Sequence, residues 1–328
     1  MSLLSIRDLR VEFATYGGTV QAVRGVNLEV QKGKTLAIVG ESGCGKSVTV
    51  QSILGLIPSP PGRIVSGSAL FNGKEMIGRP VSELNKIRGK HIGMIFQDPM
   101  TSLNPTMRVG DQIMETLLVH GNYSKSEARA RAIKLLEDVQ ISEAKSRVDH
   151  YPFQFSGGMR QRVMIAMAIA CEPDLLIADE PTTALDVTIQ AQILNLLREL
   201  QKKNKMGLVI ITHDLGVVAR MADDVAVMYA GQIVEQGTAE DVFYKSLHPY
   251  TLGLKQALPS PTVERAQLIP IEGAPPDLFS PPKGCGFYAR CKHAMKICNE
   301  NNPREFYQGE HMGRCWLHHP QAKGAELL

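Results

Sequence analysis

An octapeptide near the N-terminus has the residue types and spacing of a phosphate-binding loop. Residues 40–47 read GESGCGKS, which fits the pattern G-x-x-x-x-G-K-[ST] in full. Glycines let successive backbone N–H groups turn toward an anion, and the N-terminus of a following helix adds positive potential. Lys46 would reach the β- and γ-phosphates of a nucleotide, and the Ser47 hydroxyl would bind Mg²⁺. The expected nucleotide contacts in this stretch are Gly40, Ser42, Gly43, Cys44, Gly45, Lys46, Ser47 and Val48.

Two adjacent acids, Asp179 and Glu180, follow the apolar run 175–178. Asp179 would lie at the edge of a sheet beside the phosphate-binding loop, where Mg²⁺ must be held. Glu180 would point away from that edge on a straight strand, but Pro181 requires the chain to change direction. The alternative interpretation is that the two acids simply begin a loop.

The order of three motifs resembles that of the ATP-binding cassette (ABC) family of ATPases. Between the phosphate-binding loop and the acidic pair lies Phe155-Ser156-Gly157-Gly158-Met159. In that family, the Ser-Gly-Gly of one subunit closes over ATP held by the phosphate-binding loop of another. The resemblance therefore implies that Ser156, Gly157 and Gly158 contact ATP held by a second subunit. Phe155 and Met159 replace the outer residues of the commonest form, Leu-Ser-Gly-Gly-Gln, so the two composite sites need not be equivalent.

The same resemblance implies roles for further polar residues. Glu180 corresponds to the general base that polarises the attacking water. Gln97, in the segment IFQDP, resembles the Q-loop glutamine, which contacts Mg²⁺ and water and transmits motion to the membrane subunits. His213 follows the apolar run 208–211 and resembles the switch histidine that binds the γ-phosphate. Asp186 matches the D-loop, which communicates across the dimer.

An aromatic residue upstream of the phosphate-binding loop should stack on adenine, by analogy with the same family. Phe13 and Tyr16 are both candidates, because residues 14–18 read ATYGG and have the composition of a loop. Tyr16 is the favoured candidate, and Phe13 is the alternative.

Four of the six cysteines gather near the C-terminus, at Cys285, Cys291, Cys298 and Cys315. In a cytoplasmic chain, such a group indicates metal or cofactor binding rather than disulfides. Gaps of five, six and sixteen residues are longer than those of most zinc sites. Four thiolates would also satisfy a [4Fe–4S] cluster, whose spacings vary more widely. Spacing alone leaves zinc, an iron–sulfur cluster and no metal open.

The C-terminal part resembles the extension of oligopeptide and dipeptide importer ATPases. The resemblance rests on the segment HPYT at 248–251, a proline-rich tract at 258–282 and the run of cysteines. Some members of that subfamily carry a [4Fe–4S] cluster on these cysteines. The resemblance therefore implies such a cluster here, with zinc as the alternative.

The elements that must position these residues alternate along the chain. Apolar runs at 36–39, 175–178 and 208–211 are each followed by a plausible helix, which predicts an α/β fold with a largely parallel sheet. Ser124 and Glu127 form a possible capping box, and apolar residues recur at helical spacing between Asp186 and Lys203. We expect a P-loop NTPase core of the ABC-ATPase type at 1–247, with antiparallel N-terminal strands and a helical subdomain at about 98–167. Residues 248–328 would form the cysteine-bearing extension.

The composition excludes several classes of protein. A formal net charge of +3 is too small to indicate nucleic-acid binding. The apolar stretches are short and interrupted, so no transmembrane helix is expected, and the first residues lack the layout of a signal peptide. We therefore expect a peripheral protein on the cytoplasmic side of the plasma membrane.

The combined resemblance implies the ATP-binding and hydrolysing subunit of a bacterial importer for di- or oligopeptides. The expected partners are a second, homologous ATPase in a heterodimer, two membrane permeases and, indirectly, an extracytoplasmic solute-binding protein. Importers of nickel or other small solutes share this cassette and are the alternative. A soluble ABC ATPase acting on DNA or ribosomes, or an iron–sulfur sensor that uses ATP as a regulator, would be different classes of function.

Overall fold

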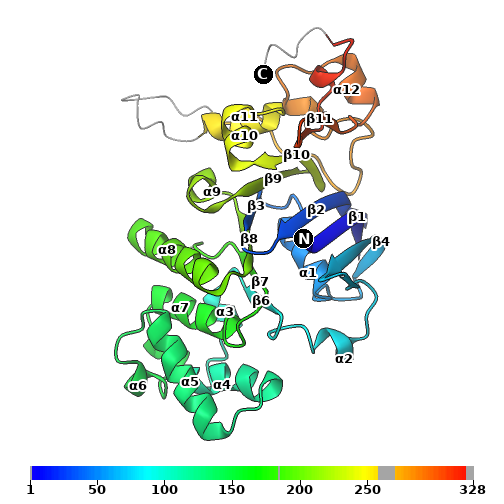
Figure 1. Cartoon of the computed structure of the whole chain (residues 1–328). Helices are drawn as coiled ribbons and strands as arrows, with labels where there is room; N and C mark the ends of the chain where they lie inside the picture. Colours follow the sequence, from blue (N-terminus) through cyan, green and yellow to red (C-terminus); the bar gives the residue numbers. More distant parts are fainter. Residues whose placement is uncertain (1, 184, 258–269, 323–328) are drawn as a thin grey trace. The chain divides into compact units, whose positions relative to one another are not determined.

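The computed structural model describes residues 2–183, 185–257 and 270–322. The chain divides into two units, each built from both strands and helices (Figure 1). Unit 1 comprises Met1–Leu3, Val30–Thr35 and Gly78–Ile211. Unit 2 comprises Leu4–Glu29, Leu36–Ile77 and Thr212–Leu328. The predicted α/β fold with a mostly parallel sheet is confirmed, whereas the boundary predicted between 247 and 248 stays a prediction.

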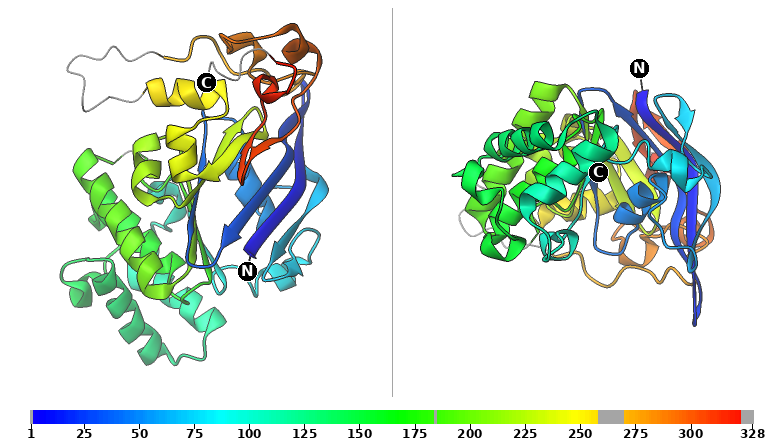
Figure 2. Two further views of the ribbon diagram at one scale, coloured as in Figure 1. Left: turned by 45° about the horizontal axis from the view of Figure 1, so that its top comes forward. Right: turned by 90° about the horizontal axis from the view of Figure 1, so that it is seen from below.

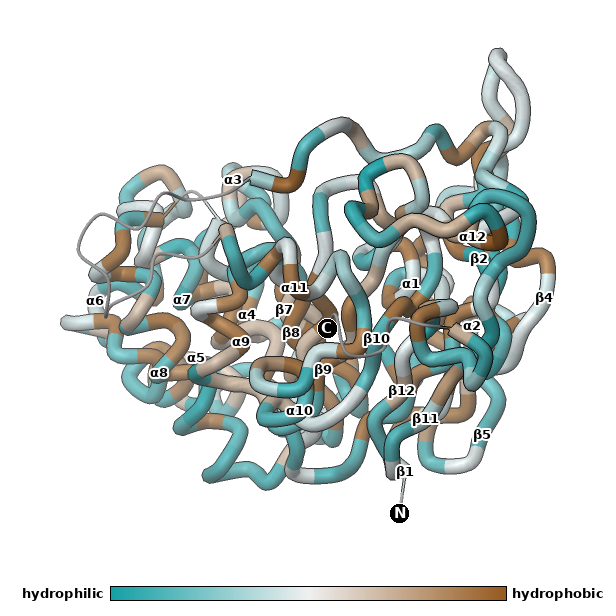
Figure 3. Tube along the Cα trace, turned by 90° about the horizontal axis from the view of Figure 1, so that it is seen from above, coloured by the Kyte–Doolittle hydropathy of each residue, from teal (hydrophilic) through white to brown (hydrophobic). Residues whose placement is uncertain are grey.

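Buried parallel strands form the sheet of unit 1. They are β6 (Ile92–Ile95), β7 (Leu175–Asp179) and β8 (Gly207–Thr212), with β7 paired to both neighbours. Every residue of β7 and β8 is buried, as expected for parallel strands covered on both faces. Figure 3 shows brown and beige, hydrophobic stretches where these strands are labelled. Gly93 lets helix α7 (Gly157–Ala168) approach β6, because a Cβ there would lie 2.2 Å from the carbonyl oxygen of Ala168.

The helices of unit 1 include the predicted helical segment. Ser124 and Glu127 form the predicted capping box at the start of α5, each accepting a backbone N–H from the other. Asp186 caps the longest helix, α8, where its carboxylate accepts the N–H of Ile189 at 3.0 Å. The helices are α2 (Val81–Leu84), α3 (Pro99–Ser102), α4 (Val109–His120), α5 (Lys125–Asp138), α6 (Ala144–Arg147), α7 (Gly157–Ala168), α8 (Val187–Asn204) and the 3₁₀ turn η1 (Pro152–Gln154).

Unit 2 contains two sheets. The first has the order β2-β1-β4-β5, and its β1–β4 and β4–β5 pairs are antiparallel, as predicted for the N-terminal strands. In the second, β3 pairs in parallel with β9, and β9 forms an antiparallel hairpin with β10. The strands are β1 (Ser2–Thr15), β2 (Gly18–Gln31), β3 (Thr35–Val39), β4 (Gly62–Phe71), β5 (Lys74–Glu75), β9 (Asp224–Tyr229) and β10 (Gln232–Thr238).

Residues after 247 add strands to the second sheet of unit 2. Strand β12 (His311–Gly313) pairs antiparallel with β10, and β11 (Phe306–Gln308) pairs with β12. Figure 2 shows this C-terminal segment, coloured orange to red, beside the hairpin of β9 and β10. The helices of unit 2 are α1 (Lys46–Ile53), α9 (Leu215–Met221), α10 (Ala239–Tyr244), α11 (Pro249–Gln256), α12 (Lys296–Glu300), η2 (Tyr288–Arg290) and η3 (Trp316–His318). None of the described helices combines the length and apolar character that a membrane crossing requires.

Candidate functional site

The phosphate-binding loop connects the buried strand β3 to helix α1 in unit 2. Its glycines at Gly40, Gly43 and Gly45 have positive φ angles. At Gly45, which immediately precedes α1, φ is +102°, and a Cβ would lie 2.3 Å from the carbonyl oxygen of Ala22. The loop therefore needs glycine at this position both for its backbone conformation and for space.

Lys46 lies inside the loop rather than in solvent. Only 5% of the residue is exposed, and its ammonium donates to the carbonyl oxygens of Gly40 at 2.8 Å and Glu41 at 2.9 Å. The side chain of Cys44 is buried as well, which raises the pKa of its thiol and keeps it neutral. Ser42 and Gly43 are exposed and form the open side of the loop.

The two candidate adenine-stacking residues lie in different surroundings. Tyr16 is fully exposed in the turn between β1 and β2. Phe13 is half-buried against β4, since a Cβ on Gly62 would lie 2.9 Å from its ring. A further aromatic ring, that of Phe279, lies against the Tyr16 turn, where a Cβ on Gly17 would be 3.5 Å from it. The sequence gives no local signal for Phe279, and the identity of the stacking residue stays a prediction.

In unit 1, the acidic pair ends strand β7, and Glu180 contacts Gln97. Asp179 is buried at the end of the strand. Glu180 then takes a left-handed conformation, with φ of +45°, which turns the chain away from the sheet. Its Oε2 accepts hydrogen bonds from the Gln97 amide at 2.9 Å and from the Thr183 hydroxyl at 3.0 Å. Two residues predicted from separate motifs are thus in direct contact.

The Ser-Gly-Gly element begins helix α7 in the same unit. Ser156 caps the helix, and its hydroxyl accepts the N–H of Met159 at 3.4 Å. Ser156 and Gly157 are exposed, whereas Phe155 is buried. Phe155, which replaces the leucine of the common signature, therefore packs in the core. The Met159 sulfur lies 3.3 Å from the Arg147 guanidinium.

The remaining predicted residues stand at the ends of elements. Asp186 uses its side chain to cap α8, as described above. His213 follows β8, is exposed and belongs to unit 2. Unit 1 thus carries Gln97, Ser156, Gly157, Gly158, Asp179, Glu180 and Asp186. Unit 2 carries Tyr16, the loop residues 40–48, His213 and the four cysteines.

Residues 23–183 match the ABC transporter family, and residues 234–298 match the C-terminal region of oligopeptide and dipeptide transporters. The dipeptide transport ATP-binding protein DppD of Bacillus subtilis is 55% identical over 326 residues, covering 99% of this chain and 97% of that protein. The oligopeptide transport ATP-binding protein OppD of the same organism is 57% identical over 328 residues, covering 99% and 91%. The chain belongs to the ATP-binding proteins of oligopeptide and dipeptide ABC transporters.

Solved structures of ABC ATPases have the same cassette. The ATP-binding cassette MJ0796, in a dimeric post-hydrolysis state bound to ADP and Pi, matches with a TM-score of 0.65 and 28% identity. The match covers 72% of this chain and 98% of that one. ABC ATP-binding proteins of this type are ATPases that power transport. The backbone nest, the lysine and the oxygen donors of the motifs fit a nucleotide with Mg²⁺.

The predicted iron–sulfur cluster of this ABC ATPase is wrong. The cysteines at 285, 291, 298 and 315 line one cavity, but its volume is only about 10 Å³, too small for an iron–sulfur cluster. Among the described residues, no group of three or more His, Cys, Asp or Glu side chains is arranged to hold a metal, which removes support for zinc as well. Burial raises the pKa of Cys285 to about 11 and that of Cys315 to about 12. The curated relatives are named as ATP-binding proteins only.

Proposed function

We propose that this ABC ATPase hydrolyses ATP to drive the uptake of di- or oligopeptides through a membrane transporter. The observation that carries this proposal is the identity to DppD and OppD over almost the whole chain, at 55% and 57%. The match to the transporter C-terminal region at 234–298 supports the same substrate class. Selection among peptides would lie in other subunits, because the motifs of this chain serve to bind and hydrolyse ATP.

The chemistry would be divided among the motif residues. Lys46 would bind the β- and γ-phosphates, with Ser47, Gln97 and Asp179 as ligands of Mg²⁺. Glu180 would accept the proton of the attacking water as general base, and His213 would bind the γ-phosphate. The hydrogen bonds from Gln97 and Thr183 to Glu180 support this role, because a general base must be held in a fixed orientation. Tyr16 would stack on adenine.

The exposed Ser156 and Gly157 support a partner chain. They lie at the start of α7, where backbone N–H groups can bind phosphate oxygens. We propose that they contact ATP held by a second, homologous ATPase, and that Asp186 lies at the contact between the two chains. The dimeric state of the MJ0796 cassette supports the pairing of two such chains. In the complete importer, the heterodimer would bind two permeases on the cytoplasmic face of the membrane, and a solute-binding protein would deliver the peptide from outside.

The test uses the assembled transporter in liposomes, with a labelled dipeptide or oligopeptide and radioactive Ni²⁺ as alternative cargoes. Glu180→Gln should retain ATP binding but lose at least 100-fold in hydrolysis and uptake, about the scale of a lost general base. Glu172→Gln is the matched control, because this exposed carboxylate of unit 1 pairs with Arg131 on the surface. Undiminished hydrolysis in Glu180→Gln would refute its role. Uptake of Ni²⁺ without uptake of peptide would favour the nickel importer instead.

A further inference from the structure

An arginine of the C-terminal extension holds a residue of the phosphate-binding loop. Arg290 ends the short turn η2, and its Nη1 and Nη2 donate to the two carboxylate oxygens of Glu41 at 2.7 Å and 3.0 Å. The Arg290 side chain is only 6% exposed and that of Glu41 is 26% exposed. Such a two-pronged pair, largely removed from water, is among the stronger side-chain interactions.

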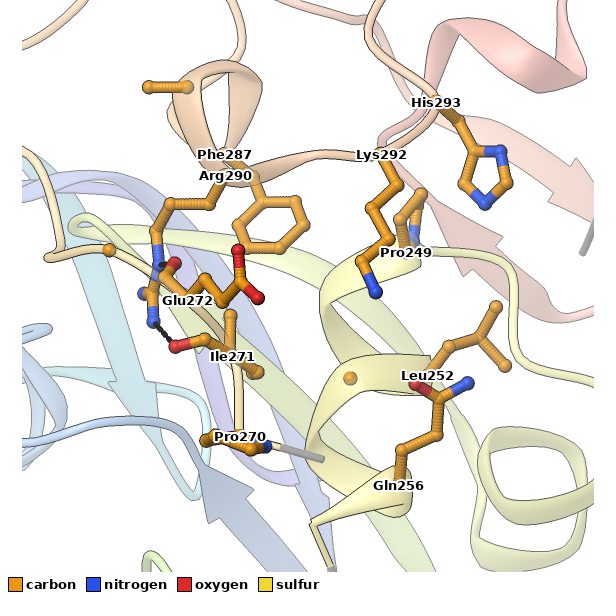
Figure 4. Close-up of a pocket in the computed structure, with 13 residues that line it drawn as sticks. Pro249, Leu252, Gln256, Pro270, Ile271, Glu272, Phe287, Arg290, Lys292 and His293 are labelled. Carbon is orange, nitrogen blue, oxygen red and sulfur yellow. Dashed lines mark hydrogen bonds between the residues drawn. The ribbon is translucent and has the colours of Figure 1, made fainter. Parts of the chain in front are cut away.

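The guanidinium of Arg290 is itself fixed on several sides. Nη1 also donates to the Tyr229 hydroxyl at 3.2 Å, Nη2 to the carbonyl oxygen of Ile271 at 3.0 Å, and Nε to that of Glu272 at 2.9 Å. Figure 4 shows Arg290 beside Phe287, with its hydrogen bond to Ile271, at one end of a pocket of about 430 Å³. Burial disfavours its charge, but the bonds to Glu41 and Tyr229 outweigh this and raise the pKa of Arg290. Arg290 is therefore a permanent cation in a preset position.

A second residue from the same part of the chain holds the backbone of Glu41. The hydroxyl of Tyr250, on α11, accepts the Glu41 N–H at 2.9 Å. Tyr250 is fully buried, and its ring packs on Tyr229 and Phe287 with centroid separations of 4.5 Å and 5.4 Å. The carbonyl oxygen of Glu41 in turn accepts from Lys46. The N–H, the carbonyl and the carboxylate of Glu41 are thus all bound.

We propose that Arg290 and Tyr250 are positioning residues of the nucleotide site, and that Arg290 neutralises Glu41 so that the loop can accept a polyphosphate. A carboxylate in a loop that binds phosphate groups would repel them if it were unpaired. The paired cation removes this repulsion, and the tyrosine fixes the backbone from which the carboxylate projects. This inference rests on the ATP-binding function proposed above.

The experiment measures the Kd for ATP of the full-length chain, at low and high salt, in a double-mutant cycle. Arg290→Gln should raise the Kd about tenfold, equivalent to ~1.4 kcal/mol, by leaving Glu41 unpaired. Glu41→Gln should change it less than about threefold, and the double variant should recover most of the lost affinity. Arg290→Lys keeps the positive charge but loses the two-pronged geometry, so its Kd should lie between those of wild type and Arg290→Gln. Added salt should shrink the defect of Arg290→Gln, because it screens repulsion between charges.

A matched control separates this role from general support of the fold. Arg314 pairs with Glu305 at 2.7 Å in the same extension, so Arg314→Gln should lower stability without changing ATP affinity. Wild-type affinity in folded Arg290→Gln would overturn the inference. A double variant as weak as Arg290→Gln, with no response to salt, would overturn the neutralisation of Glu41 by Arg290, since the loss would then come only from the missing hydrogen bonds. A wild-type chain that binds no ATP would instead refute the ATP-binding function itself.

Discussion

Replacing Gly45 by alanine tests whether the phosphate-binding loop is limited by backbone conformation or by space. Gly45 has φ of +102°, a region that alanine rarely adopts. A Cβ there would also lie 2.3 Å from the carbonyl oxygen of Ala22 and 2.8 Å from Cε of Met228. The Met228 side chain can move, but the backbone of Ala22 can do so only by disturbing its strand. Gly45→Ala therefore imposes two separate costs.

The magnitudes can be separated with a neighbour in the same loop. Gly43 also has a positive φ, +78°, but a Cβ there would meet nothing within 4 Å. Gly43→Ala should therefore cost only backbone strain, about 1–2 kcal/mol. For Gly45→Ala the strain is about 1–3 kcal/mol, and overpacking adds about 1–3 kcal/mol. We therefore expect Gly45→Ala to lower the free energy of unfolding more than Gly43→Ala does, by at least about 1 kcal/mol.

Urea unfolding of the nucleotide-free, full-length variants measures this difference directly. The midpoint of Gly45→Ala should fall clearly below that of Gly43→Ala, with little change in the slope of either transition. Nucleotide-free protein is used so that contacts with ATP do not enter the comparison. Equal midpoints for the two variants would refute the reasoning from space, since both share only the positive φ. A wild-type midpoint for Gly45→Ala would refute the reasoning from conformation as well.

Two further predictions concern buried groups of unit 2. Glu235 is fully buried; its carboxylate accepts hydrogen bonds from the N–H groups of Leu247 and His248 and lies within hydrogen-bond distance of Nε2 of His311. Glu235→Gln should therefore lower the free energy of unfolding by about 2–4 kcal/mol. An effect as small as that of Glu240→Gln, at an exposed position, would contradict this prediction. Burial, with a smaller effect of His318, lowers the pKa of His248 to about 3, below the value of about 6.5 in an unfolded chain. Its stabilising contribution is therefore present above pH 6.5 and is lost as the pH falls, because only the unfolded chain takes up the proton. His248→Asn should make the free energy of unfolding less steep between pH 6.5 and 5, and an unchanged slope would contradict the prediction.

Local patterns in the sequence predicted the features that depend on neighbouring residues. The capping box of Ser124 and Glu127 is such a feature, because its donors and acceptors lie within one helical turn. Asp186 begins α8 for a similar reason, since an acid before an apolar helical repeat marks a helix start. The buried strands β7 and β8 were predictable from their continuous apolar runs, because parallel strands covered on both faces are apolar throughout.

Features that depend on distant pairings were not predictable in the same way. Nothing near Glu235 or Gln236 indicates that β10 pairs with Gly313 and Met312 of β12. The left-handed conformation of Glu180 depends on its place after a buried strand and on its contacts with Gln97 and Thr183. The sequence predicted only that the chain changes direction at Pro181. For the cysteines, the sequence predicted a metal cluster that the structure does not support. They are close in the sequence and line one cavity, but the spacing could not show that this cavity is too small for a cluster.

The pair Arg290 and Glu41 shows why a motif pattern can omit part of a site. The pattern of the phosphate-binding loop specifies its glycines, lysine and hydroxyl, and it leaves position 41 open. An acid at that open position adds a negative charge where a phosphate must bind, so the charge must be balanced by a residue outside the motif. Arg290 lies 249 positions away along the chain and supplies that balance. The extension, which sequence patterns describe as a separate region, is therefore physically part of the nucleotide site.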